Sequence, residues 1–158
     1  MHQRAALSEP ERDNASPFPS FFSVLFLKFL PMFPYQNLEV YKKAFNNNRK
    51  VYAYLKVQRT LPSYLKSQFG RSALSIMLNI AEGSGRLTSK DRKSFFVIAR
   101  GSAFECASIA EFLRAEDEIS EELKTELVAG FEEVSKILFV MIRNLGETKE
   151  KEKQRPQR

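Results

Sequence analysis

Asn79 and Glu82 come closest to a catalytic pair in this chain. They lie three positions apart, which places both side chains on one face of a helix, and a carboxylate there could act as a general acid or base. No second acid, histidine or metal ligand lies in the same stretch. We therefore interpret both residues as structural groups that hydrogen-bond the backbone or a partner helix. Glu105 could join this network or pair with Arg71 or Arg86.

The other signals for chemistry do not reach a complete motif. The run Gly83–Arg86 (GSGR) lacks the Lys-Ser/Thr pair and the preceding strand of a phosphate-binding loop. His2 is the only histidine, so metal sites and histidine-based catalysis lose their usual ligand or base. Cys106, the only cysteine, is expected in the core and permits no intrachain disulfide, which favours the cytoplasm. We predict no catalytic residues, no metal site, no cofactor and no enzymatic activity.

Charge is distributed unevenly along the chain. Residues 35–100 hold thirteen Lys or Arg and three Asp or Glu, a net charge of +10. Residues 101–146 hold four Lys or Arg and ten Asp or Glu, a net charge of −6. Such asymmetry is typical of a surface for a polyanion or of a subunit whose basic side meets the acidic side of its neighbour, and a solvated basic face is the third reading.

The candidate nucleic-acid contacts are the basic residues in the positively charged part. They are Lys42, Lys43, Arg49, Lys50, Lys56, Arg71, Arg86, Lys90, Arg92 and Lys93. Each phosphate that such a residue neutralises releases counterions, so binding would depend strongly on salt. No aromatic RNA-binding signature or recognition-helix motif is present, so we expect weak sequence specificity.

Four amphipathic helices must position these residues. Apolar residues recur at spacings of three and four over about residues 37–59, 63–82 and 89–114, and over a fourth helix that starts within the acidic run 116–122 and ends at Gly146. Strand alternation is absent from residues 35–146. Short links between amphipathic helices predict an all-α, antiparallel up-down-up-down four-helix bundle.

The same spacing predicts which face of each helix is buried. The expected core positions are Leu38, Tyr41, Phe45, Tyr52 and Leu55; Leu65, Phe69, Ala73, Ile76, Met77 and Ile80; Phe95, Ile98, Ala99, Ser102, Cys106, Ile109 and Leu113; and Leu123, Leu127, Phe131, Val134, Leu138, Met141 and Leu145. The small residues around Gly101 should let a neighbouring helix approach closely. Asn46–Asn48 are poor helix formers, so a local irregularity is expected there.

The link between the second and third helices carries a signal for the end of one helix and a signal for the start of the next. Gly83 and Gly85 accept positive φ at little steric cost, so the second helix should end after Glu82. Thr88 and Asp91 have the spacing of a capping box, which predicts that the third helix begins near Ser89.

Both ends of the chain differ from the bundle in composition. Residues 1–31 contain a polar, proline-containing stretch and the apolar run Phe21–Leu30, which is too short for a membrane span of about 20 residues. We expect a disordered or mis-assigned N-terminal extension, with Met32 as the alternative start, and keep a signal peptide or anchor as the other possibility. Residues 147–158 have no apolar side chain and are expected to be a disordered charged tail.

The block from Asn79 to Gly83 (NIAEG), followed by Phe95, Gly101-Ser102 and Glu105, resembles the bacterial four helix bundle protein family, also called 23S rRNA intervening-sequence proteins. The similarity covers about residues 35–146 and marks Asn79, Glu82, Gly83, Gly101, Ser102 and Glu105 as its structural motif. It implies a homopentamer that resembles the accessory proteins of diversity-generating retroelements, with RNA or DNA and a reverse transcriptase as partners. It implies no catalytic residues.

These observations predict a cytoplasmic, non-catalytic bundle that self-associates, exposes a basic surface and does not enter membranes. The first hypothesis is an accessory protein that binds RNA or DNA with weak sequence specificity. The alternative is an assembly or adaptor protein whose charge asymmetry serves only contacts with other subunits or proteins. A hydrolase using Glu82 and Glu105 is a distant third.

Overall fold

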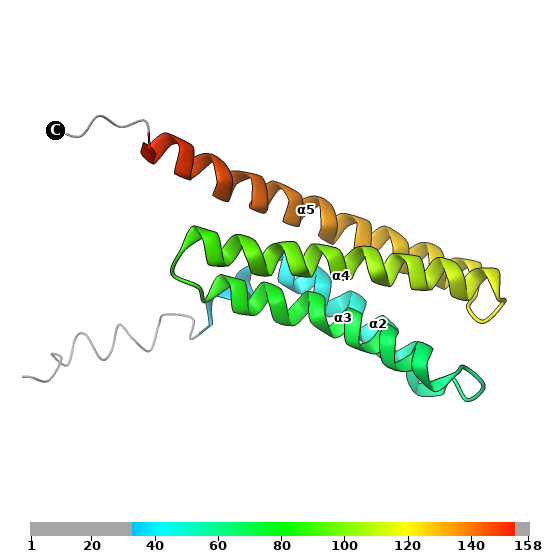
Figure 1. The fold of residues 1–158 in the computed structure, drawn as a ribbon. Coiled ribbons are helices and arrows are strands. Elements are labelled where there is room, and N and C mark those ends of the chain that lie inside the picture. Colours follow the sequence, from blue (N-terminus) through cyan, green and yellow to red (C-terminus); the bar gives the residue numbers. More distant parts are fainter. Residues whose placement is uncertain (1–32, 154–158) are drawn as a thin grey trace, which may run out of the picture. The chain divides into compact units, whose positions relative to one another are not determined.

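The computed structural model describes residues 33–153, with side chains through residue 146. A short 3-10 helix, η1 (Pro34–Asn37), precedes four α-helices. These are α2 (Glu39–Val57), α3 (Ser63–Ser84), α4 (Ser89–Ala115) and α5 (Glu121–Lys153). Residues 33–153 contain no strand, which confirms the predicted all-α class (Figure 1). The predictions for residues 1–31 and for residues 154–158 of the tail lie outside the described residues.

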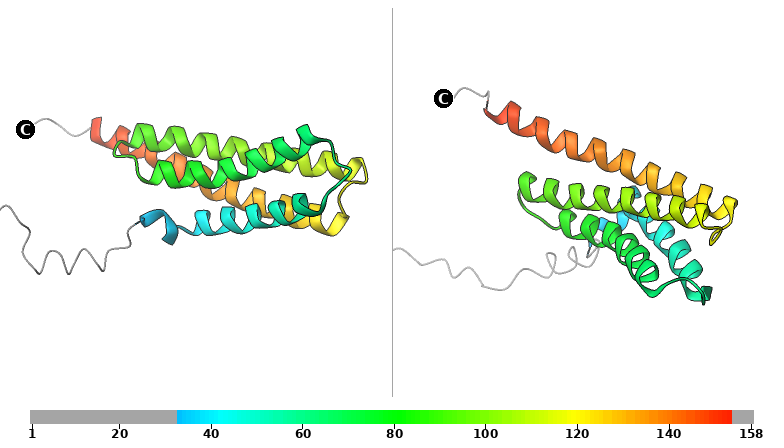
Figure 2. Two further views of the ribbon diagram at one scale, coloured as in Figure 1. Left: turned by 90° about the horizontal axis from the view of Figure 1, so that it is seen from below. Right: turned by 45° about the vertical axis from the view of Figure 1, so that its right-hand side comes forward.

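Successive helices run in opposite directions, as the colour gradient in Figures 1 and 2 shows. α2 and α4 each pack against both α3 and α5, which closes the bundle. Ion pairs give the relative direction of α2 and α5. Lys43 pairs with Glu133 at 3.0 Å, and Lys50, one heptad later, pairs with Glu126, one heptad earlier, at 2.7 Å. The predicted up-down-up-down arrangement is therefore present.

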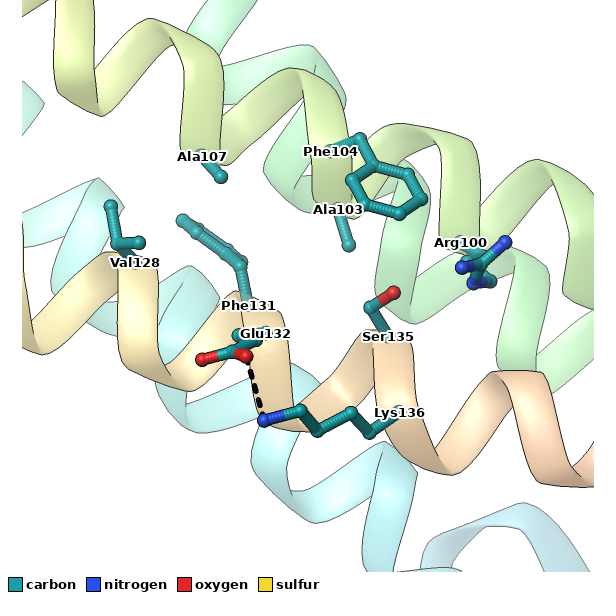
Figure 3. Close-up of a pocket in the computed structure, with 9 residues that line it drawn as sticks. All are labelled: Arg100, Ala103, Phe104, Ala107, Val128, Phe131, Glu132, Ser135 and Lys136. Carbon is teal, nitrogen blue, oxygen red and sulfur yellow. Dashed lines mark ion pairs between the residues drawn. The ribbon is translucent and has the colours of Figure 1, made fainter.

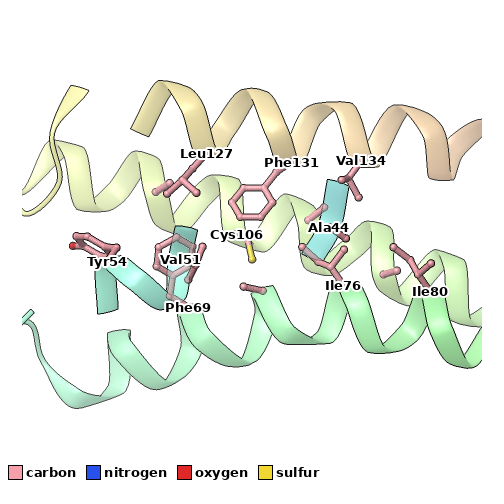
Figure 4. Packing of buried hydrophobic residues seen from close by; sticks show 14 of the residues in the cluster. Ala44, Val51, Tyr54, Phe69, Ile76, Ile80, Cys106, Leu127, Phe131 and Val134 are labelled. Atoms are coloured by element: carbon pink, nitrogen blue, oxygen red, sulfur yellow. The ribbon is translucent and has the colours of Figure 1, made fainter. Parts of the chain in front are cut away.

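The core lies where the four helices meet (Figure 4). Its largest fully buried side chains include Phe69 from α3, Phe96 from α4 and Phe131 from α5. The predicted buried faces of α3 and α5 are confirmed in their central positions. In α4 the predicted seam is correct at Ala99, Ser102, Cys106 and Leu113, whereas Ile109 is only partly buried. At its start Phe96 rather than Phe95 is buried, and Ile98 is half exposed.

The predicted core face of α2 is wrong in part: Leu38, Tyr41 and Leu55 are partly buried against the core, but Phe45 and Tyr52 are not. The buried positions of this helix are Val40, Ala44, Asn47, Val51 and Tyr54. Phe45 and Tyr52, which were expected inside, are 42% and 68% exposed. The cause is that α2 carries apolar residues around most of its circumference, so the spacing fits more than one face.

Asn47 lies in the core and not in an irregular turn. α2 is a continuous helix through Asn46–Asn48, and the predicted irregularity is absent. The Asn47 side chain packs against Gly130 of α5, where an added Cβ would lie 2.7 Å from Asn47 Cγ. Its Nδ2 is buried and has no hydrogen-bond acceptor among the described residues. Gly130 thus makes the space that this amide occupies.

The corner between α3 and α4 differs in part from expectation. α3 ends at Ser84 with Gly85 as its C-cap, so the helix stops within the predicted glycine run but two residues later than expected. No described glycine has a positive φ, so the predicted left-handed terminator is wrong. Gly83 is instead a packing residue, since a Cβ there would lie 2.7 Å from the Phe96 ring. The capping box is confirmed: Thr88 Oγ1 accepts the Asp91 N–H at 3.1 Å and donates to Asp91 Oδ2 at 2.6 Å.

α5 continues beyond its predicted end. The helix passes through Gly146 and reaches Lys153, so residues 147–153 are helical and not a disordered tail. A glycine inside a helix costs only about 1 kcal/mol relative to alanine. The Glu and Lys residues that follow it are good helix formers, which favours continuation of the helix.

The corner between α4 and α5 is held by charged side chains. Asp117 has a positive φ of 56°, and the chain turns there. Arg114 bonds Asp117 at 2.5 Å and Glu121 at 3.1 Å. The hydrogen bond from Lys124 is the largest of several interactions that lower the pKa of the Glu121 carboxyl below its ordinary value. None of the helices between residues 33 and 153 has both the length and the apolar character needed to cross a bilayer.

Candidate nucleic-acid interface

The ten candidate cations lie on three helices and one link. Five are on α2 (Lys42, Lys43, Arg49, Lys50 and Lys56), Arg71 is on α3, Arg86 follows α3, and Lys90, Arg92 and Lys93 are at the start of α4. They do not form one patch. Ion pairing and helix face divide them into groups with different environments.

Three of the ten are neutralised inside the chain. Lys43 lies 3.5 Å from Glu39 and 3.0 Å from Glu133, and Lys50 lies 2.7 Å from Glu126. The hydrogen bond to Glu133 is the largest cause of the raised pKa of Lys43. Arg86 pairs with Glu82 and covers the Phe95 ring at 4.6 Å. These three cations stabilise contacts within the bundle.

Three other α2 cations are exposed and unpaired. Lys42, Arg49 and Lys56 recur every seven residues, so they share one face of the helix. None forms an ion pair with a carboxylate among residues 33–146. The neighbouring acids are few, because Glu39 is the only acid in α2 and Glu82 the only acid in α3. This face therefore presents uncompensated positive charge.

Two exposed aromatic side chains interleave with these cations. Phe45 lies three residues after Lys42, and Tyr52 lies three residues after Arg49, so all five residues share a face. We call this face the α2 stripe: Lys42, Phe45, Arg49, Tyr52 and Lys56. The sequence prediction missed the aromatic members because it assigned them to the core. The alternation of basic and aromatic residues at spacings of three and four was the signal that could have found them.

Several hollows border the α2 stripe, and two of them contain an aromatic ring. One, of about 410 Å³, lies beside Phe45 and is lined by Gln36, Tyr41, Lys42, Phe45 and Asn46. The other, of about 230 Å³, lies beside Tyr52 between α2 and α3 and is lined by Asn48, Arg49, Val51, Tyr52, Leu55, Gly70 and Leu74. Each hollow combines an aromatic ring, a cation and an asparagine. Exposed Arg71 follows Gly70 directly and extends the positive charge onto α3.

The start of α4 forms a second basic group. Lys90 and Lys93 are exposed, and the Arg92 Nε is buried without a hydrogen-bond acceptor among the described residues. Positive charge is unfavourable at a helix N-terminus because the macrodipole is positive there. These residues therefore do not stabilise the helix by their charge. Figure 1 shows that this helix start lies at the end of the bundle where α2 begins.

The motif residues form hydrogen bonds between α3 and α4. Asn79 Nδ2 donates to the Ser75 carbonyl at 2.8 Å, and Ser75 Oγ lies 2.9 Å from Ser102 Oγ. Glu105 accepts from Gln68 rather than pairing with an arginine. Gly101 is exposed and has no atom of another element within 4 Å of an added Cβ, so close approach at that position within the chain is not observed.

The residues that could do chemistry are occupied or buried. Glu82 and Glu105 have the partners just described, and they lie on different helices. Burial raises the pKa of the Cys106 thiol to about 12, and its Sγ lies 3.2 Å from Ser72 Oγ. A thiol with this pKa is almost wholly protonated near neutral pH and is a poor nucleophile.

A third hollow, of about 310 Å³, lies between α4 and α5 (Figure 3). Ala103, Phe104 and Ala107 line it from α4, and Val128, Phe131 and Ser135 line it from α5. Its exposed ring, Phe104, differs from the rings of the α2 stripe because a cation covers it. The Arg100 guanidinium lies 4.8 Å from the Phe104 ring centre and 5.4 Å from that of Phe139.

Comparison with known proteins gives a family and a structural neighbour. The model of the family described as 23S rRNA-intervening sequence protein matches residues 36–140. A crystal structure from Bacteroides thetaiotaomicron, described as a protein of unknown function from the S23 ribosomal protein family, is 26% identical. The alignment covers 65% of this chain and 97% of that one, with a TM-score of 0.61. No curated protein matches.

Proposed function

This chain belongs to the 23S rRNA-intervening sequence protein family, and from that premise we propose that it is a non-catalytic nucleic-acid-binding protein. The α2 stripe is the proposed contact surface. The observation that carries the proposal is that Lys42, Arg49 and Lys56 remain exposed and unpaired on one face, while Lys43 and Lys50 of the same helix are neutralised by α5. We place this activity in the cytoplasm.

Phosphate contacts by these cations supply the binding free energy. A lysine or arginine that neutralises a phosphate releases condensed counterions, and this gain does not depend on base sequence. The described residues present no helix or strand with base-reading side chains in a known recognition pattern, so the protein would bind RNA or DNA with weak specificity. Self-association would repeat the α2 stripe around an assembly and strengthen binding through multivalency.

The test is fluorescence anisotropy with a labelled RNA of about 16 nucleotides. Wild-type affinity should fall steeply between about 50 and 200 mM salt. The triple variant K42Q/R49Q/K56Q should bind more weakly and reduce the slope of log K against log salt by about 2, at about 0.7 per lost contact on a single strand. Lys136→Gln is the control: it removes a charge beside the hollow between α4 and α5 and should retain wild-type binding.

The exposed apolar side chains favour a second candidate function. Leu74, Leu78, Ile98 and Phe112 are each between 42% and 52% exposed on α3 and α4, and exposed apolar patches mark contact surfaces. Under this alternative the protein is an assembly or adaptor protein, and its charges serve subunit contacts or contacts with a protein partner such as a reverse transcriptase.

Light scattering separates the two candidates. The family resemblance implies a pentamer, whose mass would be five times the 18.2 kDa of one chain. If K42Q/R49Q/K56Q dissociates the assembly, and wild-type protein shows no RNA binding at moderate salt, the charges serve assembly and the nucleic-acid proposal is wrong. If the triple variant keeps the wild-type mass and loses RNA affinity, the assembly alternative does not account for the α2 stripe.

A further inference from the structure

The aromatic rings of the α2 stripe are open to solvent, as are those of Tyr64 and Phe112 elsewhere, whereas a guanidinium covers several other rings of the described chain. Phe95 is covered by Arg86, and Phe104 and Phe139 by Arg100. No guanidinium lies over Phe45 or Tyr52 among the described residues, although Arg49 lies between them in the sequence. Both rings therefore keep a free face, next to cations that also lack a partner.

Each free ring borders a hollow with hydrogen-bonding groups. Phe45 shares its hollow with Lys42 and Asn46, and Tyr52 shares its hollow with Arg49 and Asn48. A ring face, a cation and an amide within one depression match the three parts of a nucleotide unit: the base, the phosphate and the polar base edge. The ring and the cation recur one heptad apart on α2, and each hollow has its own asparagine, Asn46 or Asn48.

We propose that the α2 stripe binds single-stranded nucleic acid, with unpaired bases stacked on Phe45 and Tyr52 and the intervening phosphates held by Lys42, Arg49 and Lys56. This rests on the proposed function and specifies its ligand. A base within a duplex is already stacked on both faces and its ring cannot lie against a side chain on the helix surface. A splayed single strand offers ring faces and phosphates in alternation, which is the order of the α2 stripe.

The dimensions suit a short run of nucleotides. Lys42 and Lys56 lie about 21 Å apart along the helix axis, and Phe45 and Tyr52 about 10 Å apart, at 1.5 Å per residue. An aromatic cluster extends this surface toward η1. The Phe45 ring centre lies 6.4 Å from that of Tyr41, which lies 4.7 Å from that of Tyr35. These rings buttress Phe45 from one side and leave its exposed face to the ligand.

The test compares one RNA in two forms. The probe is a labelled single strand of mixed sequence and about 16 nucleotides, used alone and annealed to its complement. Phe45→Leu and Tyr52→Leu keep an apolar side chain and all charges but remove the stacking ring. Each should weaken binding of the single strand about tenfold and leave duplex binding within about twofold, because a stacked base contributes of the order of one decade in affinity. Far-UV circular dichroism checks that both variants fold.

The matched control is Phe104→Leu with Phe139→Leu, which removes two rings of similar exposure that Arg100 already covers. This variant should bind the single strand like wild type. A second readout is intrinsic tyrosine fluorescence, since the chain has no tryptophan. Binding of the unlabelled strand should quench it, and Tyr52→Leu should remove most of the quenching.

The outcomes separate this inference from the broader proposal. If both ring variants bind the single strand like wild type while K42Q/R49Q/K56Q binds weakly, stacking is refuted and charge-driven binding stands. Equal weakening toward single strand and duplex also refutes stacking, because the rings then act through assembly or the fold. If wild-type protein binds neither probe, both the inference and the proposed function are wrong.

Discussion

Replacing Gly130 by alanine should destabilise the bundle by an amount that depends on Asn47. A Cβ at position 130 would lie 2.7 Å from Asn47 Cγ, well inside ordinary van der Waals distance. Asn47 is 4% exposed on the inner face of α2, so its amide has no free volume into which it could move. Gly130→Ala therefore forces α2 and α5 apart or drives the Asn47 side chain out of its rotamer.

The expected free energies follow from two opposing effects. Alanine in place of a helix-interior glycine stabilises by about 0.5–1 kcal/mol, whereas overpacking of a core costs about 1–3 kcal/mol. Gly130→Ala should therefore lower the free energy of unfolding by about 1–2 kcal/mol. In an Asn47→Ala background the obstructing amide is gone, and the same substitution should stabilise by about 0.5–1 kcal/mol. The coupling between the two sites is then about 1.5–3 kcal/mol.

The assay is a double-mutant cycle in urea, followed by far-UV circular dichroism at one protein concentration because self-association would shift the midpoint. Asn47→Ala alone loses packing and also removes an Nδ2 that has no acceptor among the described residues, and the cycle cancels that contribution. Gly101→Ala is the control, since nothing lies within 4 Å of its added Cβ. An equal effect of Gly130→Ala in both backgrounds would refute the packing argument.

Three further predictions concern the fold and its titratable groups. Gly83→Ala should destabilise the protein by about 1–3 kcal/mol, because the new Cβ would lie 2.7 Å from the Phe96 ring. Gly101→Ala should stabilise it by about 0.5–1 kcal/mol, because nothing lies near its added Cβ. Urea denaturation measures both free energies of unfolding. With a pKa of about 12, Cys106 should resist a thiol reagent in the folded protein and react in denaturant; fast labelling of the native protein would contradict its burial. The pKa of Glu121 lies below its ordinary 4.5, so its charge stabilises the fold above that pH. This stabilisation disappears as the pH falls through the folded pKa. Glu121→Gln should therefore lower the urea midpoint at about pH 7 and leave it unchanged at about pH 2.

The arrangement of the helices followed from the sequence because the main apolar spacing of α3, α4 and α5 identifies most of their buried positions. α3 and α5 bury the positions that their spacing predicted, among them Ile76 and Phe131. The same spacing did not identify the buried face of α2, because Tyr52 and Tyr54 are both aromatic and lie on different faces. Which of two apolar faces turns inward depends on how closely neighbouring helices approach, and spacing within one helix carries no information about that distance.

The ends of helices were less predictable than their faces. Gly83 and Gly146 both lie near predicted termini, and the helix continues through each. At position 83 the absence of a side chain leaves room for the Phe96 ring of the next helix. A glycine required for close packing and a glycine required for a turn look the same in one sequence, because the difference lies in a residue far along the chain.

The sequence predicted the positive charge of the candidate site but not which of its residues share one exposed surface. The count of basic residues between 35 and 100 predicted a positive region, yet it could not separate Lys43 and Lys50 from Lys42 and Arg49. The pairing partners Glu126 and Glu133 lie more than seventy residues away in the sequence. Only the antiparallel register of α2 and α5 brings them together.

That register explains why the free cations and the open rings share one face. α5 carries its acids one heptad apart, and they neutralise the α2 cations that also lie one heptad apart on the facing side. The cations of the α2 stripe, Lys42, Arg49 and Lys56, have no facing acid in α3, because the only acid of α3 pairs with Arg86. A basic face retained solely for solubility has no need of exposed Phe45 and Tyr52 between its charges, since each exposed ring costs hydration free energy. A ligand that combines anionic groups with flat apolar rings accounts for both features at once.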